Sequence, residues 1–385
     1  MPLLASLLIF ILILSFLVLI HELGHFIVAK WAKINVEEFG LGYPPLARKL
    51  FTWKGTAFTL NWIPFGGFVK MQGEEGQPSS EVEQTGSAQP KTSGDFQSKS
   101  TAWRLAVIVA GASVNFVFGV IAFALIFSIM GIPTAMTEAR VAAVLPGSPA
   151  EKSGLPTAVT IIALKTAGST DPITTRQEAI TKIAERTGET ITLVTTGQCE
   201  GATCQEMAQE FQMYVRTPEE LVAAGQNGAV GIAFQSEYFK FYPWYEMPIR
   251  GTLFGLAQAV QLSVLIVQTL GSTIADLFKN GTVPADIMGP IGIVDIATKN
   301  EALLRGPLAI LQFAGLLSIN LAIMNILPIP ALDGGRALFI FLEKIFGKKR
   351  IAKIEGAAHY GGFIVLMILI VLISGRDIFR VFAGS

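Results

Sequence analysis

The chain has 385 residues, of which 51% are hydrophobic and only 15% are charged. Its 29 basic and 29 acidic residues balance, which argues against a nucleic-acid partner, because such proteins carry an excess of basic residues. The composition is typical of a membrane protein with several spans and one modest soluble domain.

The amino-terminal segment is an apolar run, residues 3–20, that ends in His21-Glu22-Leu23-Gly24-His25. Residues four apart share one face of a helix, so both imidazoles can bind one Zn²⁺ while Glu22 takes a proton from the attacking water. The pattern predicts a metallohydrolase whose metal site lies in or at the edge of the bilayer. The alternative is a membrane helix that ends in a polar, snorkelling cluster. Because the run lacks a charged leader and a small-residue cleavage site, we expect a retained span.

Three further apolar stretches approach the ~20 residues that a bilayer requires. They are predicted as spans two to four: residues 103–130, 308–326 and 357–374. Basic residues cluster in the loops after spans one and three, so both loops are expected to face the cytosol. This orientation places the amino terminus, residues 133–300 and the carboxyl terminus outside.

The first cytosolic loop contains two segments, 36–42 and 57–71, whose β-branched and aromatic residues predict short strands, interrupted by Pro64, Gly66 and Gly67. An edge of this hairpin beside the metal could pair with an extended peptide through main-chain groups. The alternative is a purely structural hairpin. Residues 73–100 are rich in Ser, Gln, Gly and Glu, and predict a disordered linker.

Residues 141–234 predict one small α/β domain. Ser148 and Thr175 each precede a glutamate by three positions, which predicts two helix starts. Residues 191–196, 211–215 and 229–234 are predicted as strands. The only cysteines, Cys199 and Cys204, bracket the turn between two of these strands. An external position permits a disulfide there, and two free thiols are the alternative.

The third span runs directly into residues 325–336, a segment rich in proline and glycine that contains Asp333. Irregular backbone near membrane depth is tolerated only where it lines protein or a water-filled cavity. A carboxylate in such a place is usually functional, so Asp333 is the candidate third ligand, with the fourth position left for water. The alternative role is a cap for a helix that begins near Gly334.

A further apolar segment, residues 253–278, carries Gln258, Gln261 and Gln268. If it crossed the membrane, Asp333 would lie on the far side of about 30 Å of hydrocarbon from His21 and His25. We therefore expect this segment to lie along the outer interface or dip into it.

Four matches, in the same order along the chain, make it resemble the bacterial site-2 proteases, which are intramembrane zinc metalloproteases with a periplasmic PDZ domain. Residues 21–25 match the zinc motif, residues 66–71 the membrane-associated β-hairpin and residues 110–116 the second span. The fourth match consists of Asn320, Asn325, Pro328, Pro330 and Leu332-Asp333-Gly334-Gly335. Residues 144–155 resemble the opening of the PDZ domain, but residues 156–160 replace the Pro-Gly-Asp and strand that usually follow it.

The resemblance implies hydrolysis of a peptide bond within or near the transmembrane helix of a single-pass membrane protein, with Zn²⁺ as the cofactor. It suggests membrane-anchored anti-sigma factors or remnant signal peptides as substrates. Glu22 would be the general base, and the metal ligands would be His21, His25 and Asp333. Substrate contacts would come from Asn325, Asn320, Gly66, Gly67, Phe68 and Val69. The amide of Asn115 would either join helices or touch substrate, and His359 is expected to be an interfacial histidine rather than a ligand.

The expected fold is an α-helical protein of the bacterial inner membrane, with four transmembrane helices, a membrane-associated β-hairpin and one extracytoplasmic α/β PDZ-like domain. We expect a monomer that is surrounded by lipid, has no nucleic-acid partner and has its active site toward the cytosol. The expected parts are the first span with the zinc motif (1–28), the hairpin and linker (29–101), the second span (102–132), the PDZ-like domain (133–238), an interfacial linker with an amphipathic helix (239–305), and spans three and four with the third-ligand motif (306–385).

Two other functions are weighed against this one. A catalytically inactive membrane adaptor that binds partners through the PDZ-like domain would be expected to lack Glu22 or Asp333, and both are present. A soluble-type metallopeptidase tethered by one helix would keep its motif in a polar helix, whereas both ligand segments here flank membrane spans.

Overall fold

In a computed structural model, the chain forms two units, each with its own core. One unit comprises Met1–Ile129 and Trp244–Ser385, and the other comprises Met130–Pro243. The structure describes residues 2–74, 93–166, 168–196, 199–200, 203–204, 208–224, 228–280, 292, 302–304 and 306–383.

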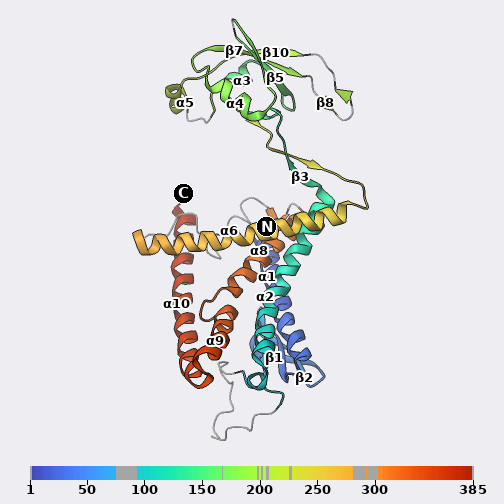
Figure 1. Ribbon diagram of the computed structural model, residues 1–385, viewed down its shortest axis with the longest axis vertical. Helices are drawn as coiled ribbons and strands as arrows, with labels where there is room; N and C mark the ends of the chain where they lie inside the picture. The colour runs from blue at the N-terminus through green and yellow to red at the C-terminus, as the bar shows by residue number, and fades with distance from the viewer. Residues whose placement is uncertain are drawn as a thin grey trace. The chain divides into compact units, whose positions relative to one another are not determined.

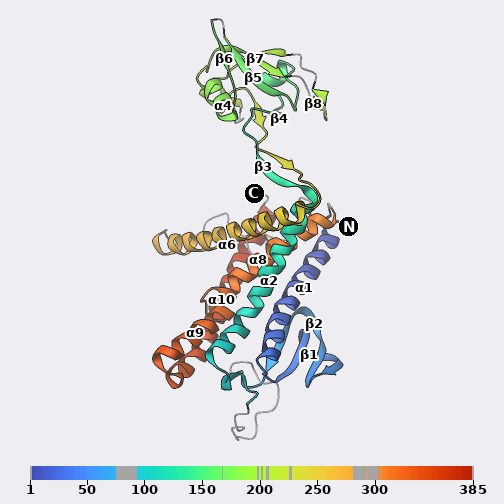
Figure 2. The same cartoon turned by 45° about the vertical axis from the view of Figure 1, so that its right-hand side comes forward.

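Four long helices run in one general direction through the first unit (Figures 1 and 2). They are α1 (Pro2–Trp31), α2 (Thr101–Met130), α8 (Pro307–Ile326) and α10 (Lys348–Ala383). Each contains a stretch predicted as a span and is long and apolar enough to cross a membrane. The short η2 (Ala302–Leu304) precedes α8, and α9 (Asp333–Phe346) lies between α8 and α10.

Helix α2 packs closely against both α1 and α8. A Cβ at Gly24 of α1 would lie 2.7 Å from the carbonyl oxygen of Ala110, so the two backbones approach where no side chain intervenes. A Cβ at Gly119 would instead meet the side chain of Ile319 in α8. Glycine at such contacts is typical of helices that pack inside membranes. These contacts set the positions of α1, which carries His21 and His25, and of α8, which precedes the segment that leads to Asp333.

A fifth helix of sufficient length and apolarity, α6 (Met247–Asn280), runs across the direction of α1, α2 and α8 in both views (Figures 1 and 2). Its buried side is a stripe of small residues, Gly251, Gly255 and Ala259. A Cβ at Gly255 would lie 2.7 Å from the backbone nitrogen of Ala124 in α2, so this stripe rests directly on the end of α2. Helix α6 is thus crosswise to these helices, while the interfacial position of residues 253–278 stays a prediction.

The hairpin differs from its prediction, because β1 (Val36–Trp53) and β2 (Thr56–Met71) are long rather than short. Residues 43–53 were not predicted as strand, since they contain Pro44, Pro45 and several basic residues. They pair with the start of β2 across a tight turn at Lys54 and Gly55, both of which have positive φ. This two-residue turn suits the twist of a hairpin.

The two long strands bend, so that four segments lie side by side. Phe39 pairs with Val69 and also with Phe58, and Phe58 pairs in turn with Phe51. Residues 67–70 therefore lie at one edge of this sheet, and among the described residues only the strand segment 38–41 pairs with them. This edge is available for a further extended strand.

Part of the predicted linker is ordered. Residues 75–92 lie outside the described residues, but residues 93–100 include η1 (Phe96–Ser98), with Phe96 buried. The backbone of Phe96 donates to the oxygen of Gln72 at 2.8 Å, and that of Asn35 donates to the oxygen of Gly94 at 2.9 Å. The expectation of disorder was wrong for this end, because one large apolar side chain is buried and two backbone hydrogen bonds hold the segment to the turn after α1 and to the end of β2.

The second unit contains an antiparallel sheet in the order β10-β7-β5-β6, and three pairs, β11-β4, β12-β3 and β8-β9. Its strands are β3 (Ile132–Ala135), β4 (Val141–Val144), β5 (Thr160–Lys165), β6 (Thr170–Pro172), β7 (Thr190–Thr196), β8 (Cys199–Glu200), β9 (Thr203–Cys204), β10 (Gln209–Tyr214), β11 (Ile232–Phe234) and β12 (Glu237–Lys240). Its helices are α3 (Pro149–Lys152), α4 (Arg176–Ala184) and α5 (Pro218–Ala224). One apolar core joins the sheet, α3 and α4.

Both predicted helix starts are confirmed in this unit. The Thr175 side chain accepts a hydrogen bond from the backbone N–H of Glu178, and the Glu178 carboxylate accepts one from the backbone N–H of Thr175. The hydroxyl of Ser148 accepts in the same way from the backbone of Glu151 at 3.2 Å. Strand β5 begins at Thr160, the last residue of the segment 156–160, so a strand follows the PDZ-like opening even though its usual Pro-Gly-Asp is missing.

Cys199 and Cys204 are directly opposite each other in the β8–β9 pair, while their side chains lie outside the described residues. Directly opposed residues have Cα atoms about 4.5–5.5 Å apart, which a disulfide can bridge. We expect mass spectrometry of freshly isolated, alkylated protein to find the two residues linked, with little effect of the bond on cleavage. Two alkylated thiols would contradict this prediction.

Candidate metal centre

Three side chains that are distant in sequence meet at one point of the first unit. His21 and His25 lie one turn apart on α1, and Asp333 is the first residue of α9. Asp333 Oδ2 lies 3.0 Å from His21 Nε2 and 3.2 Å from His25 Nε2, and the two Nε2 atoms are 3.1 Å apart. Both histidines are buried. The structure thus brings together the three predicted metal ligands.

The spacing of these donors fits zinc. Two ligands at the usual Zn–N and Zn–O distances of a tetrahedral site are about 3.3 Å apart, close to the three separations found here. Burial would raise the pKa of the Asp333 carboxyl, but hydrogen bonds from His21 and His25 hold this pKa well below its usual range when the two rings are protonated. A carboxyl group binds a metal ion in its ionised form, and the two neutral imidazoles would bind it through their unprotonated nitrogens.

The ring of His25 is oriented by α2. Its Nδ1 donates to the carbonyl oxygen of Val107 at 2.8 Å, which leaves Nε2 with a free lone pair toward Asp333. A backbone carbonyl in this position fixes both the tautomer and the direction of a ligating imidazole. This contact joins two helices and has no local sequence signal.

The ring of His21 is held by Asn115, whose side chain is completely buried. Asn115 Nδ2 lies 3.4 Å from His21 Nδ1, while Asn115 Oδ1 is buried with no partner among the described residues. Rotating the amide by half a turn would bring this oxygen to Nδ1, which would then donate to it and leave Nε2 free for a metal. Asn115 also joins helices, because its carbonyl oxygen accepts from Ser318 of α8 at 2.7 Å.

Gly111 of α2 provides the space for both imidazoles. A Cβ at this position would lie 2.8 Å from His21 Nε2 and closer still to His25 Nε2. Any side chain here would thus displace the donor atoms themselves. Val107, Gly111 and Asn115 are four residues apart, so one stripe of α2 faces the metal centre.

Asp333 reaches this centre because α8 ends early. The helix stops at Ile326, and the chain then passes through Pro328 and Pro330 before α9 begins. The alternative role of Asp333 as a helix cap is wrong, because the cap residue is Leu332 and Asp333 is already helical. One turn later, Arg336 forms an ion pair with the buried Glu74, which follows the hairpin.

Glu22 and the hairpin edge lie beside each other. A Cβ at Gly67 would be 3.7 Å from Glu22 Cγ, so the backbone of the edge segment runs past the predicted general base. The neighbouring Phe68 stacks on Tyr43 with ring centroids 6.5 Å apart. Burial, and then the charge of Glu22, raise the pKa of the Tyr43 phenol, so this side chain stays neutral. Gly66 has positive φ, while Gly67 and Val69 are buried.

Asn320 and Asn325 lie on the last two turns of α8, and both are half-buried. Neither side-chain amide forms a hydrogen bond with any residue that the structure describes. Among the described residues, no hydrogen bond joins them to His21, His25 or Asp333.

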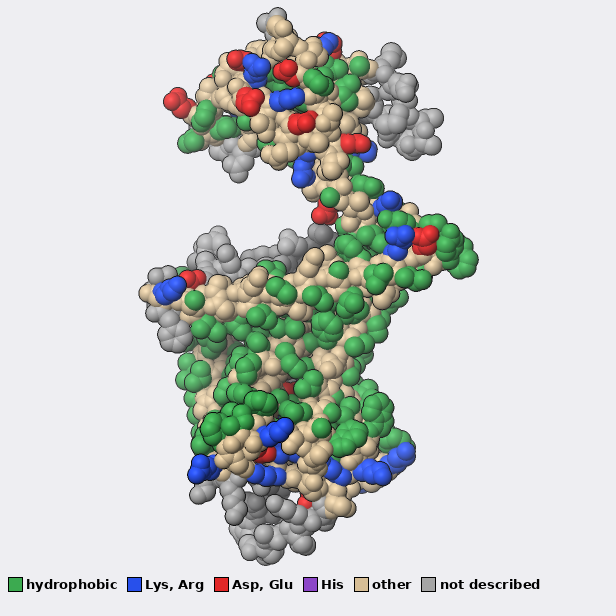
Figure 3. Space-filling view, in the orientation of Figure 1, with side chains coloured by type: hydrophobic (Ala, Val, Ile, Leu, Met, Phe, Trp, Pro, Cys, Tyr) green, Lys and Arg blue, Asp and Glu red, His purple; other side chains and the backbone are tan. Residues whose placement is uncertain are grey.

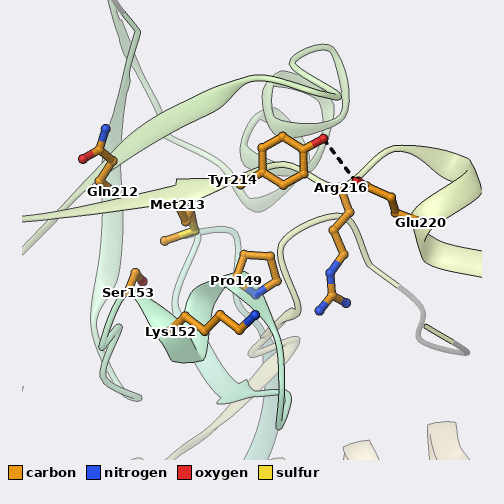
Figure 4. Close-up of a pocket in the computed structure, with 8 residues that line it drawn as sticks. All are labelled: Pro149, Lys152, Ser153, Gln212, Met213, Tyr214, Arg216 and Glu220. Atoms are coloured by element: carbon orange, nitrogen blue, oxygen red, sulfur yellow. Dashed lines mark hydrogen bonds between the residues drawn. The ribbon is translucent and has the colours of Figure 1, made fainter. Parts of the chain in front are cut away.

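The second unit has a separate open pocket of about 460 Å³ between α3, β10 and α5 (Figure 4). Lys152 and Arg216 line it, and Tyr214 contacts Glu220 at 3.5 Å on its wall. None of the predicted site residues lies in this pocket.

Two imidazoles and a carboxylate that converge beside a glutamate are typical of a metallohydrolase. Both imidazoles are on α1, a helix of spanning length, so this metallohydrolase is membrane-associated. Comparison with protein families supports a narrower assignment, because residues 9–369 match peptidase family M50. The chain therefore belongs to this family, the site-2 proteases, and is a multi-pass membrane protein and a zinc metalloprotease.

Individual relatives are similar in sequence to this chain over nearly their whole lengths. The zinc metalloprotease RasP of Oceanobacillus iheyensis is 27% identical over 97% of this chain and 98% of its own length. A protein of Clostridium perfringens, provisionally named a zinc metalloprotease, is 32% identical over 94% of this chain and 96% of its own. A protein of Rhizobium meliloti, also provisionally named a zinc metalloprotease, is 28% identical over 96% of this chain and 95% of its own length.

Proposed function

We propose that the protein is an intramembrane endopeptidase that cleaves single-pass membrane proteins within or near their transmembrane segments. One observation carries this proposal: His21, Glu22 and His25 lie inside a helix of spanning length, and Asp333 follows another directly. A peptide bond that reaches these residues must itself be at membrane depth. Membrane-anchored anti-sigma factors and remnant signal peptides are substrates of this kind.

The residues have complementary roles in this reaction. Bound Zn²⁺ supplies Lewis acidity, which polarises a carbonyl and lowers the pKa of water to about 7. Glu22 accepts a proton from the attacking water and passes it to the leaving amine. Gly66, Gly67, Phe68 and Val69 offer main-chain groups to an extended substrate beside Glu22, and the amides of Asn320 and Asn325 offer further hydrogen bonds.

Cleavage within a span can be tested with purified protein in liposomes and a single-pass substrate. The cut is expected inside the substrate's apolar segment, because the metal ligands lie on spanning helices. Mass spectrometry of both fragments gives the position of the cut. Two results together would contradict an intramembrane site. The substrate would be cut only in its soluble flank, and the rate of this cleavage would be the same after the apolar segment is detached from the bilayer.

The proposed topology has four spans, namely α1, α2, α8 and α10, with α6 at the outer interface. The crosswise direction of α6 supports this arrangement (Figure 1). Side-chain charge supports the orientation, because Lys and Arg gather at the end of the first unit that holds β1, β2 and α9, whereas hydrophobic side chains cover its middle (Figure 3). By the positive-inside rule, that end faces the cytosol.

Single cysteines at Tyr238 and Asn300, which flank α6 in sequence, test this topology. An impermeant thiol reagent added from outside is expected to label both, since a helix that does not cross leaves its two flanks on one side. A cysteine at Lys49 serves as the control and is expected to be labelled only after the membrane is permeabilised. Labelling of Tyr238 and Asn300 from opposite sides would contradict the four-span topology.

We assign the second unit to an extracytoplasmic, PDZ-like role. A groove of about 390 Å³ between α4 and β11 supports this role, because it is lined by apolar side chains, including Ile180, Ile183 and Phe234. An extended peptide laid beside a strand in such a groove is a recurring mode of recognition. An inactive adaptor would use the same groove, but it would not need Glu22 or Asp333.

A further inference from the structure

We propose that His359 is a positioning residue for Asp333 and acts by holding the backbone of Ala331. The ring lies in α10, 26 residues beyond Asp333 in sequence, yet its Nδ1 accepts a hydrogen bond from the backbone of Ala331 at 2.9 Å. The sequence pattern had indicated only an interfacial histidine. This inference rests on the assignment of Asp333 as a zinc ligand.

The backbone of Ala331 needs such support. Its φ is +80°, in the left-handed region that residues with a Cβ avoid. The N–H groups around Ala331 offer little other restraint, because Pro328 and Pro330 have no N–H, and the N–H groups of Ile329 and Leu332 bond only to the nearby oxygens of Leu327 and Ile329. Among the described residues, the bond to His359 is thus the one N–H contact from residues 328–332 to another helix.

Helix α10 is shaped to make this contact. Gly362, almost one turn after His359, allows the helix to approach closely, since a Cβ there would lie 2.8 Å from the carbonyl oxygen of Pro330. The imidazole also rests against Phe339 of α9, with ring centroids 5.3 Å apart. Because Nδ1 accepts, the ring proton is on Nε2, which is buried without a hydrogen-bond partner among the described residues.

Ala331 influences the metal centre because it is close to Asp333 in the chain. Ala331 is two residues before Asp333, so its φ sets the direction in which α9 begins and where the carboxylate lies. If the bond is lost, Ala331 relaxes toward negative φ, and Asp333 moves away from His21 and His25. His359 itself touches none of the three ligands.

The two ring nitrogens can be distinguished by substitution. The oxygen of asparagine occupies nearly the position of Nδ1, whereas glutamine places its terminal atoms near Nε2. We expect His359→Asn to keep zinc affinity within about twofold, and His359→Gln to lower it about tenfold or more. Affinity is measured on the full chain in detergent by competition with a chromophoric chelator. The matched control is Tyr360→Phe, at an exposed neighbouring position, which is expected to bind zinc normally.

A second substitution tests the backbone argument. Glycine adopts positive φ without strain, so Ala331→Gly added to His359→Gln should restore most of the lost affinity. Wild-type affinity in His359→Gln, or no recovery in the double variant, would overturn the proposal. If His359→Gln does not fold, failure of His359→Asn to bind zinc in a folded protein would also overturn it. The ligand assignment is tested separately by Asp333→Ala, whose wild-type affinity would refute that assignment.

Discussion

Glu22→Gln is expected to abolish peptide-bond cleavage while zinc stays bound. The amide cannot accept the proton from water, and loss of a general base costs about 10²–10⁴-fold in rate. It leaves His21, His25 and Asp333 in place, since Glu22 is not among the three donors that converge. His21→Ala and His25→Ala should lose both metal and cleavage. Zinc per chain and the rate of cleavage of a single-pass substrate check these outcomes.

The matched control for this experiment is Glu37→Gln, because Glu37 forms only an exposed ion pair with Lys70, at 3.0 Å. It is expected to change neither zinc content nor rate, as exposed pairs contribute little. Full activity of Glu22→Gln would refute the assigned role of Glu22. Loss of zinc in the same variant would show that Glu22 acts on the ligands and not only on the attacking water.

Gly111→Ala is expected to lower zinc affinity by about 10²-fold, although alanine is the better helix former. The added methyl group would occupy the space of His21 Nε2 and His25 Nε2, at a place where the backbones of α1 and α2 are already in close contact through Gly24 and Ala110. Chelator competition measures the affinity, and thermal unfolding of the metal-free protein measures stability. The zinc affinity and the thermal stability of the metal-free protein should thus change independently of each other.

Gly361→Ala is the matched control, since a Cβ at that position in α10 would meet no atom within 4 Å. It should bind zinc normally. If Gly111→Ala also binds normally, the imidazoles have other positions available, and the close fit of α2 is not required for the site.

The cluster of His21, His25 and Asp333 could be predicted from sequence because local geometry determines most of its arrangement. The four-residue spacing of His21 and His25 acts within one helix, and the prolines before Asp333 force an irregular segment at the end of α8. The interfacial position of residues 253–278 stays a prediction, which rests on the depth that one metal site imposes on its ligands, because the composition of α6 resembles that of a span.

The residues that sequence reasoning missed act through tertiary contacts. The carbonyl oxygen of Val107 and the space at Gly111 have no side-chain chemistry to notice, and the partner of Asn115 lies on another helix. His359 was set aside for the same reason, because its partner is a backbone group. In the hairpin, residues 43–53 were missed since their prolines and basic residues conceal a paired strand.

The stripe of Val107, Gly111 and Asn115 makes the metal centre sensitive to the rotation of α2 about its own axis. Successive residues of a helix are turned by about 100°, so one residue inserted between Val107 and Asn115 would remove part of the stripe from the histidines while leaving composition and hydrophobicity almost unchanged. A shift of α2 by one full turn would restore the angular phase but displace every contact by about 5.4 Å. Metal loading is thereby coupled to one register of α2 against α1, and the zinc-bound protein should form only after these helices have assembled correctly in the bilayer.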